Sequence, residues 1–195
     1  MQTDLFGQDR TISADWRFSD QNLIFVSLAG DGLRPQVHGR GGALCRQLGL
    51  DGLRLERVLH VTVSHFGHYG HIPEAIAEAR AIGKAMVVRR SQIILDRYGS
   101  FSNPQNDNPF VLSASETPDA LKLLNKELAK RVRRLGLECP SGINPHVTLR
   151  YGPELVPFSE LAPSIVWPLD ELVLIMSRRG AQEHIIIDRW PAVGS

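Results

Sequence analysis

Cysteine is scarce in this chain, and long apolar runs are absent. The 195 residues include two cysteines, Cys45 and Cys139, which are too few to indicate a disulfide framework. No apolar run approaches the ~20 residues that a membrane-spanning helix needs, and the opening MQTDLFGQDR lacks the apolar core of a signal peptide. We therefore expect a cytoplasmic protein with no membrane partner.

An excess of charge of one sign is also absent. The 22 Lys and Arg residues nearly balance the 21 Asp and Glu residues, so the net charge of +1 does not by itself indicate a nucleic-acid binder. A hydrophobic content of 43% is ordinary for a soluble globular protein. The length suits a single bilobal domain over residues 22–195, which we expect to be monomeric, behind a polar N-terminal tail over 1–21.

Apolar periodicity and turn residues predict strands that alternate with helices. The predicted strands are 22–30, 56–67, 86–99, 108–115, 145–152, part of 164–180, and 183–190. The predicted helices are the end of 34–50, then 72–85 and 116–136. The last is the clearest, because Leu121, Leu124, Leu128 and Val132 give it one apolar stripe. This order predicts an α+β fold, in which a helix–strand unit occurs twice.

One short strand sequence is written twice. LHVTVSHFG at 59–67 and PHVTLRYG at 145–152 each contain His-Val-Thr, followed by an aromatic residue and glycine. Because side chains alternate along a strand, the histidine and threonine of each triplet share one face while the valine faces the core. A single such triplet is unremarkable, but two of them on predicted strands indicate two halves of one site.

Two histidines and two threonines on one face suit chemistry on a phosphate diester. A neutral imidazole can take a proton from the attacking oxygen while a protonated one gives a proton to the leaving oxygen. His60 and His146 are therefore the candidate catalytic pair. The hydroxyls of Thr62 and Thr148 can donate hydrogen bonds to the phosphate oxygens. This chemistry requires neither a metal nor a cofactor.

The doubled motif resembles the 2H phosphoesterase superfamily, which is marked by two H-x-[TS]-hydrophobic motifs in duplicated lobes. The branch most similar to this chain is the 2′-5′ RNA ligase and RNA 2′,3′-cyclic phosphodiesterase group. The resemblance runs from about residue 22 to about 191, and only the doubled motif is specific. It implies a bilobal α+β fold with duplicated antiparallel sheets, helices outside and a central cleft.

The resemblance also implies a function and residue roles. The implied reaction is metal-independent hydrolysis of 2′,3′-cyclic phosphates of RNA ends or nucleotides to 2′-phosphates. His60 would be the general acid and His146 the base, an assignment that another substrate could reverse. Arg150 stands one position earlier than the arginine of the family motif, and its even spacing from His146 and Thr148 predicts a place beside the phosphate.

Other readings of the same residues stay open. His65, with His68 and His71, has the spacing of a conceivable metal site, but loop histidines at the mouth of the cleft are the favoured reading. We expect His65, Tyr69 and Tyr151 at the substrate rim.

The alternative functions are 2′-5′ RNA ligation by the reverse reaction, and a non-catalytic module that binds RNA or nucleotides.

Overall fold

A computed structural model describes residues 21–67, 73–140, 142–178 and 183–194. Its elements follow one another as β1 (Gln21–Leu28), α1 (Leu33–Leu48), η2 (Glu56–Val58), β2 (His60–Gly67), α2 (Pro73–Lys84), β3 (Ser91–Ser100), β4 (Asn108–Ser113), α3 (Asp119–Arg134), β5 (His146–Gly152), β6 (Ser159–Leu169), β7 (Glu171–Arg178) and β8 (His184–Pro191). Of the expected tail, only Gln21 is described, and it begins β1.

The strands form one open sheet in the order β6-β3-β4-β5-β2-β1-β7-β8, and every neighbouring pair is antiparallel. The first four strands in this order make one half of the sheet and the last four make the other. The halves meet between β5 and β2, where the register contains the single pair Val61 and Val147. The duplicated α+β architecture expected from the sequence is confirmed, and its two halves are joined through the motif strands into one continuous sheet.

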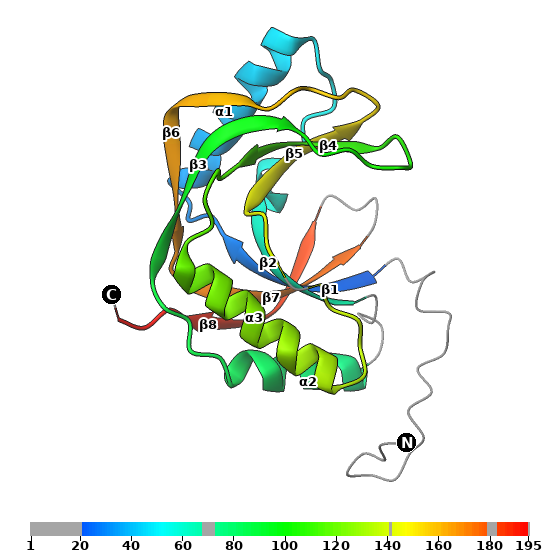
Figure 1. The fold of residues 1–195 in the computed structure, drawn as a ribbon, viewed down its shortest axis with the longest axis vertical. Coiled ribbons are helices and arrows are strands. Elements are labelled where there is room, and N and C mark those ends of the chain that lie inside the picture. The colour runs from blue at the N-terminus through cyan, green and yellow to red at the C-terminus, as the bar shows by residue number, and fades with distance from the viewer. Residues whose placement is uncertain (1–20, 68–72, 141, 179–182, 195) are drawn as a thin grey trace.

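The helices cover the two halves separately. Figure 1 shows α2 and α3 alongside the half that contains β1 and β7, and α1 beside the half that contains β3 and β6. The stripe predicted for α3 is buried, as Leu121, Leu124, Leu128 and Val132 all pack into the core. Within the described residues, no helix is long and apolar enough to cross a membrane.

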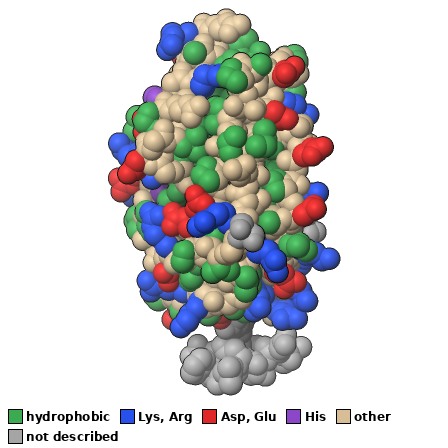
Figure 2. Space-filling model, turned by 90° about the vertical axis from the view of Figure 1, so that its left-hand side faces the viewer, with side chains coloured by type: hydrophobic (Ala, Val, Ile, Leu, Met, Phe, Trp, Pro, Cys, Tyr) green, Lys and Arg blue, Asp and Glu red, His purple; other side chains and the backbone are tan. Residues whose placement is uncertain are grey.

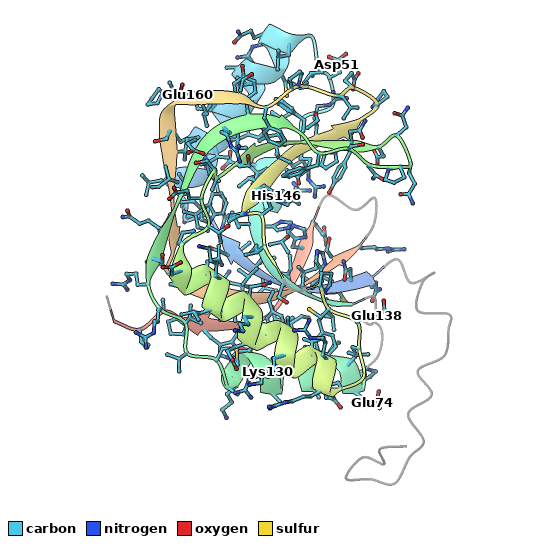
Figure 3. All side chains as sticks on the ribbon, viewed as in Figure 1. Asp51, Glu74, Lys130, Glu138, His146 and Glu160 are labelled. Atoms are coloured by element: carbon cyan, nitrogen blue, oxygen red, sulfur yellow. The ribbon has the colours of Figure 1, made fainter. Side chains whose placement is uncertain are left out.

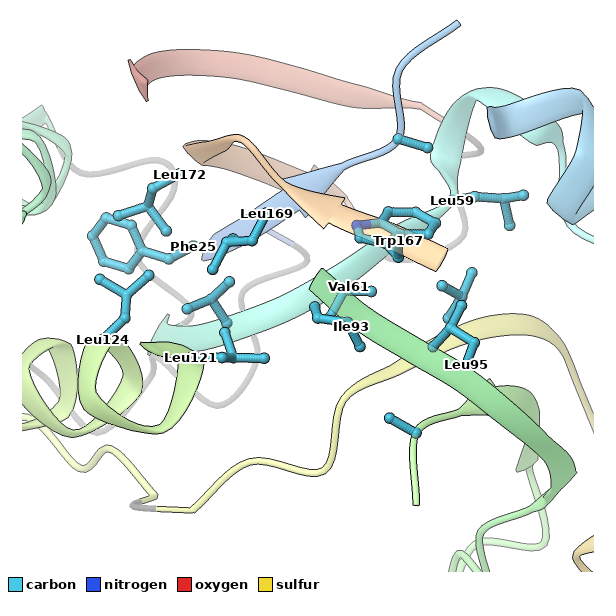
Figure 4. Packing of buried hydrophobic residues seen from close by; sticks show 14 of the residues in the cluster. Phe25, Leu59, Val61, Ile93, Leu95, Leu121, Leu124, Trp167, Leu169 and Leu172 are labelled. Atoms are coloured by element: carbon cyan, nitrogen blue, oxygen red, sulfur yellow. The ribbon is translucent and has the colours of Figure 1, made fainter. Parts of the chain in front are cut away.

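The main core draws side chains from both halves. Trp167 and Leu169 of β6 lie beside Phe25 of β1 and Val61 of β2 in Figure 4, and all four are fully buried. The indole nitrogen of Trp167 donates a hydrogen bond to Ser27 Oγ at 3.0 Å, which satisfies both groups in the interior. Apolar packing and this bond thus hold β6 of one half against β1 of the other.

One strand was not predicted from the sequence. A single strand was predicted within 164–180, but Ser159–Leu169 forms a separate strand, β6. Pro163 and Pro168 interrupt the apolar pattern of this strand. Proline has no N–H to donate, so in strands it is found mainly on edge strands, at strand beginnings or at bulges, and β6 is the terminal strand of this sheet. Figure 2 shows a side of the molecule on which acidic and basic side chains are interspersed with apolar ones, as the balanced composition predicts.

Candidate active site

The two His-Val-Thr triplets lie on the adjacent central strands β2 and β5 and line one cleft. The cleft has a volume of about 380 Å³, and its lining includes His60, Thr62, His146 and Thr148. In both triplets the valine is fully buried while the histidine and threonine are partly exposed. His146 lies close to the centre of the molecule, between the two halves (Figure 3). The four residues that the sequence singled out are therefore brought together.

Each motif strand has a β-bulge directly after its threonine. In β2, Thr62 pairs with Val26 and Ser64 pairs with Phe25, so Val63 is an extra residue. In β5, Thr148 pairs with Val111 and Arg150 pairs with Phe110, and Leu149 is the extra residue. A bulge interrupts the strict alternation of side chains, so the residue after it changes face.

Groups outside the sheet bind the carbonyl oxygens of both bulged residues. Asn125 Nδ2 of α3 donates to Val63 O at 2.8 Å, and the backbone N–H of Arg54 donates to Leu149 O at 2.7 Å. Both bulges therefore keep their backbone acceptors satisfied, as buried backbone groups must. The duplication thus extends from the triplets to the irregularity that follows them.

The two β-bulges correct the position expected for Arg150 and explain the positions of Tyr151 and His65. Even spacing predicted Arg150 on the cleft face, but Arg150 is 7% exposed, is not among the residues that line the cleft, and binds Glu154 Oε2 through Nη1 at 2.9 Å. The following residue, Tyr151, lines the cleft instead, as does His65 at the equivalent place in β2. The predicted rim residue Tyr69 lies outside the described residues, as do His68 and His71.

The catalytic candidates are anchored in the same way in both strands. Nδ1 of His60 lies 2.9 Å from Val58 O, and Nδ1 of His146 lies 2.7 Å from Asn144 O. A carbonyl oxygen only accepts, so Nδ1 carries the proton in each ring and donates it. The reactive nitrogen left over in each imidazole is therefore Nε2.

The two histidines differ in their neighbours. His60 meets His184 of β8, with ring centroids 4.9 Å apart and the rings edge to face. His146 meets Phe101 in a similar arrangement, at 5.1 Å. His184 was not predicted as a site residue, because nothing near it in the chain marks it as part of a site.

Burial lowers the pKa of both catalytic candidates. Desolvation, followed by the nearby His184, lowers the pKa of His60 to about 3. Desolvation also lowers the pKa of His146, against the opposing effect of its hydrogen bond to Asn144 O. With both pKa values lowered, both rings are neutral at pH 7. An anionic phosphate would favour their protonated forms, because an opposite charge nearby raises the pKa of a histidine.

Arg54 is a second residue near His60 that was not predicted from the sequence, and unlike His184 it lines the cleft. It lies before η2, lines the cleft, and places its guanidinium 5.4 Å from the ring centre of Tyr151. No ion pair to a carboxylate is formed by Arg54 within the part of the chain that the structure describes. Its charge is also one of the causes that lower the pKa of His60 and His184. The cleft therefore contains a cation able to attract an anionic ligand.

A metal site is not indicated in the described ranges. No group of three or more His, Cys, Asp or Glu side chains there is arranged to hold a metal ion. Two of the three loop histidines considered from the sequence fall outside these ranges, so the arrangement of that set is not described.

The lowered pKa values predict that stability falls on acidification. The unfolded chain protonates a histidine near pH 6.5, whereas folded His60 does so only near pH 3. Between these values the unfolded state binds more protons, so the free energy of unfolding decreases as pH falls, by up to about 1.4 kcal/mol per pH unit for this residue. Urea denaturation from pH 7 to pH 4.5 measures the decrease. A His60→Gln variant should show a smaller pH dependence, and an equal or larger one would contradict the assignment.

Comparison with known proteins finds similarity in structure. No protein-family model and no curated protein matches the chain. E. coli LigT complexed with 3′-AMP superimposes with a TM-score of 0.72 at 18% identity, over 89% of this chain and 99% of that one. A structure described as a phosphoesterase gives 0.68 at 20% identity, over 89% and 99%.

A protein of Thermus thermophilus gives a TM-score of 0.67 at 18% identity, over 87% of this chain and 97% of that one. These neighbours match nearly the whole of their own length, so the two halves of the sheet belong to one shared architecture. The chain therefore has the fold of E. coli LigT and of the solved phosphoesterase, which is the fold that its doubled motif implies.

Proposed function

We propose that this protein is a 2H-type phosphoesterase that hydrolyses 2′,3′-cyclic phosphates of RNA ends or nucleotides to 2′-phosphates without a metal. The observation that carries the proposal is the pair of His-Val-Thr strands, each with its histidine anchored through Nδ1 and both facing one cleft. The similar solved structures include a phosphoesterase. Solved complexes of E. coli LigT contain 3′-AMP, ATP, NADP⁺ and phosphate.

The reaction needs one proton acceptor and one proton donor on opposite sides of the phosphorus. One histidine takes a proton from water through Nε2, the water oxygen bonds to phosphorus, and the bond from phosphorus to the 3′ oxygen breaks. The other histidine, protonated at Nε2, gives its proton to that oxygen. The ring that gained a proton then returns it to solvent and the other regains one. Thr62 and Thr148 donate hydrogen bonds to the non-bridging oxygens as charge builds up there.

Phosphorus NMR tests this function directly. Purified protein is incubated with 2′,3′-cyclic AMP, and separately with a short RNA that ends in a cyclic phosphate, in the presence of EDTA. The expected result is loss of the cyclic signal and appearance of a 2′-monophosphate. Loss of turnover in EDTA with recovery on adding zinc would contradict the metal-free mechanism, and unchanged substrates would contradict the proposed reaction. Joined RNA after addition of a 5′-hydroxyl acceptor would show the ligase alternative.

Arg54 is expected to contribute binding energy for the anionic substrate. Arg54→Ala should lower kcat/KM by about 10-fold or more, because a charged hydrogen bond or ion pair in a partly buried site is worth ~1.5–3 kcal/mol. Arg54→Lys should recover part of the loss, since it restores the charge without the planar guanidinium.

The matched control for Arg54 is Lys84→Ala, which also removes one positive charge but from the exposed end of α2. Steady-state kinetics at low salt should show little effect of that change. Equal losses in the two variants would indicate a general effect of net charge and would rule out a specific contact by Arg54.

A further inference from the structure

A third histidine lies behind the catalytic pair. Nε2 of His184 is 3.1 Å from Nδ1 of His60 and 3.1 Å from Val58 O, and the two rings meet edge to face. His184 is not among the residues that line the cleft, so it is not placed to touch a bound substrate. The catalytic candidate that His184 contacts directly is His60, so an effect of His184 on the proton transfers is expected to act through that ring.

The carbonyl oxygen of Val58 is shared by both rings. His60 Nδ1 lies 2.9 Å from it and His184 Nε2 lies 3.1 Å from it. A carbonyl oxygen has two lone pairs and can accept from both. Nε2 of His184 can bind this oxygen only as a donor, because a carbonyl oxygen only accepts. The proton of neutral His184 therefore belongs on Nε2, where Val58 O accepts it.

This arrangement disfavours a positive charge on His60. The N–H of His184 presents its positive end to the ring of His60 and takes part of the electron density of Val58 O, which would otherwise stabilise the imidazolium form of His60. The other titratable or charged groups that face His60 are Arg54 and His146, and both are cationic or can become so. No carboxylate affects His60 within the described residues, so the hydrogen bond to Val58 O is left to favour the protonated form against burial and the neighbouring cationic or titratable groups.

We propose that His184 is a positioning residue that acts through His60, holding its ring edge-on and keeping it neutral until an anionic phosphate occupies the cleft. This inference rests on the proposed function, because the phosphate of the substrate is the negative charge that would favour the protonated form of His60. His184 of β8 would thus influence the protonation of His60 of β2, although the two residues are far apart in the chain. Protonation of His60 is thereby coupled to substrate binding.

Two substitutions of His184 distinguish the effect of its N–H group from the effect of its aromatic ring. His184→Phe keeps an aromatic ring against His60 but removes the donor, and His184→Gln keeps an amide donor for Val58 O but removes the ring. We expect Phe to raise the pKa of His60 by about one unit or more, a tenfold gain in proton affinity. Gln should keep the pKa near its low value. Nitrogen-15 NMR titration of the histidine rings measures the pKa of His60 in each variant, and it requires no enzymatic turnover.

The internal control in the same spectra is His146, whose titration should move little in either variant. Addition of inorganic phosphate should raise the pKa of His60 in the unaltered protein, and an unchanged value would contradict the coupling to an anionic ligand. An unchanged or lower pKa for His60 in the His184→Phe variant would overturn the inference, even if the His184→Gln variant fails to fold. A higher pKa for His60 in the Gln variant than in the Phe variant would overturn it as well. Because the titration needs no substrate, its failure is distinct from a failure to hydrolyse cyclic phosphates.

Discussion

Replacing His146 or His60 with alanine is expected to lower the turnover of a 2′,3′-cyclic phosphate by at least about 10²-fold, the usual worth of general acid–base catalysis. Both histidines line the cleft with Nδ1 held by a carbonyl oxygen, and in the proposed mechanism each supplies a proton transfer that the threonines cannot make at neutral pH. The change should fall mainly on kcat, because the rings act on the transition state more than on the bound substrate. Single-turnover hydrolysis measured by phosphorus NMR or by chromatography gives the rate.

The double variant provides a sharper test of the shared role. Groups that work as a unit do not have additive effects, so His60→Ala combined with His146→Ala should cost little more than either change alone. His38→Ala is the matched control, because His38 lies on α1 and is not among the residues that line the cleft. Unaltered turnover in either single variant, with folding intact by circular dichroism, would refute the proposed mechanism.

Trp167→Ala is expected to destabilise the protein by about 3–5 kcal/mol, the range typical of large aromatic truncations in cores. Trp167 is fully buried, packs between the two halves, and satisfies Ser27 Oγ through its indole N–H. The alanine leaves a cavity at the junction that sets the two motif strands in place. Urea denaturation followed by circular dichroism measures the loss as a lower midpoint.

The neighbouring residue on the same strand is the control for this change. Val166 is 46% exposed on the opposite face of β6, and Val166→Ala should change stability by no more than about 0.5 kcal/mol. A loss below about 1 kcal/mol for Trp167→Ala would contradict the view that this side chain joins the two halves. Because the same junction holds the cleft together, we also expect weaker substrate binding in Trp167→Ala near its unfolding midpoint.

Local patterns in the sequence predicted the fold class and the central site. Strand periodicity places His and Thr of each triplet on one face, and the structure brings both triplets to one cleft. The apolar stripe of α3 is likewise a local property, since a helical period of 3.6 residues determines which side chains share a face. The repetition of the triplet made a shared site the simplest explanation, because two strands of a duplicated fold occupy equivalent places.

Other features depended on contacts between distant segments. A β-bulge has no reliable local signal, so the alternation argument placed Arg150 in the cleft, where the structure has Tyr151 instead. The edge position of β6 allows its two prolines, and that position is known only once the whole sheet is assembled.

The sequence by itself thus determined the four candidate residues of the site, through a repeated pattern whose geometry is fixed within each strand. Tertiary structure alone decided what surrounds them. Arg54 enters the cleft from the loop before η2, and His184 reaches His60 from the far end of the chain. The reason is physical: the pKa and the orientation of a buried imidazole depend on burial and on charges within a few ångströms, and those neighbours are chosen by strand order rather than by sequence proximity.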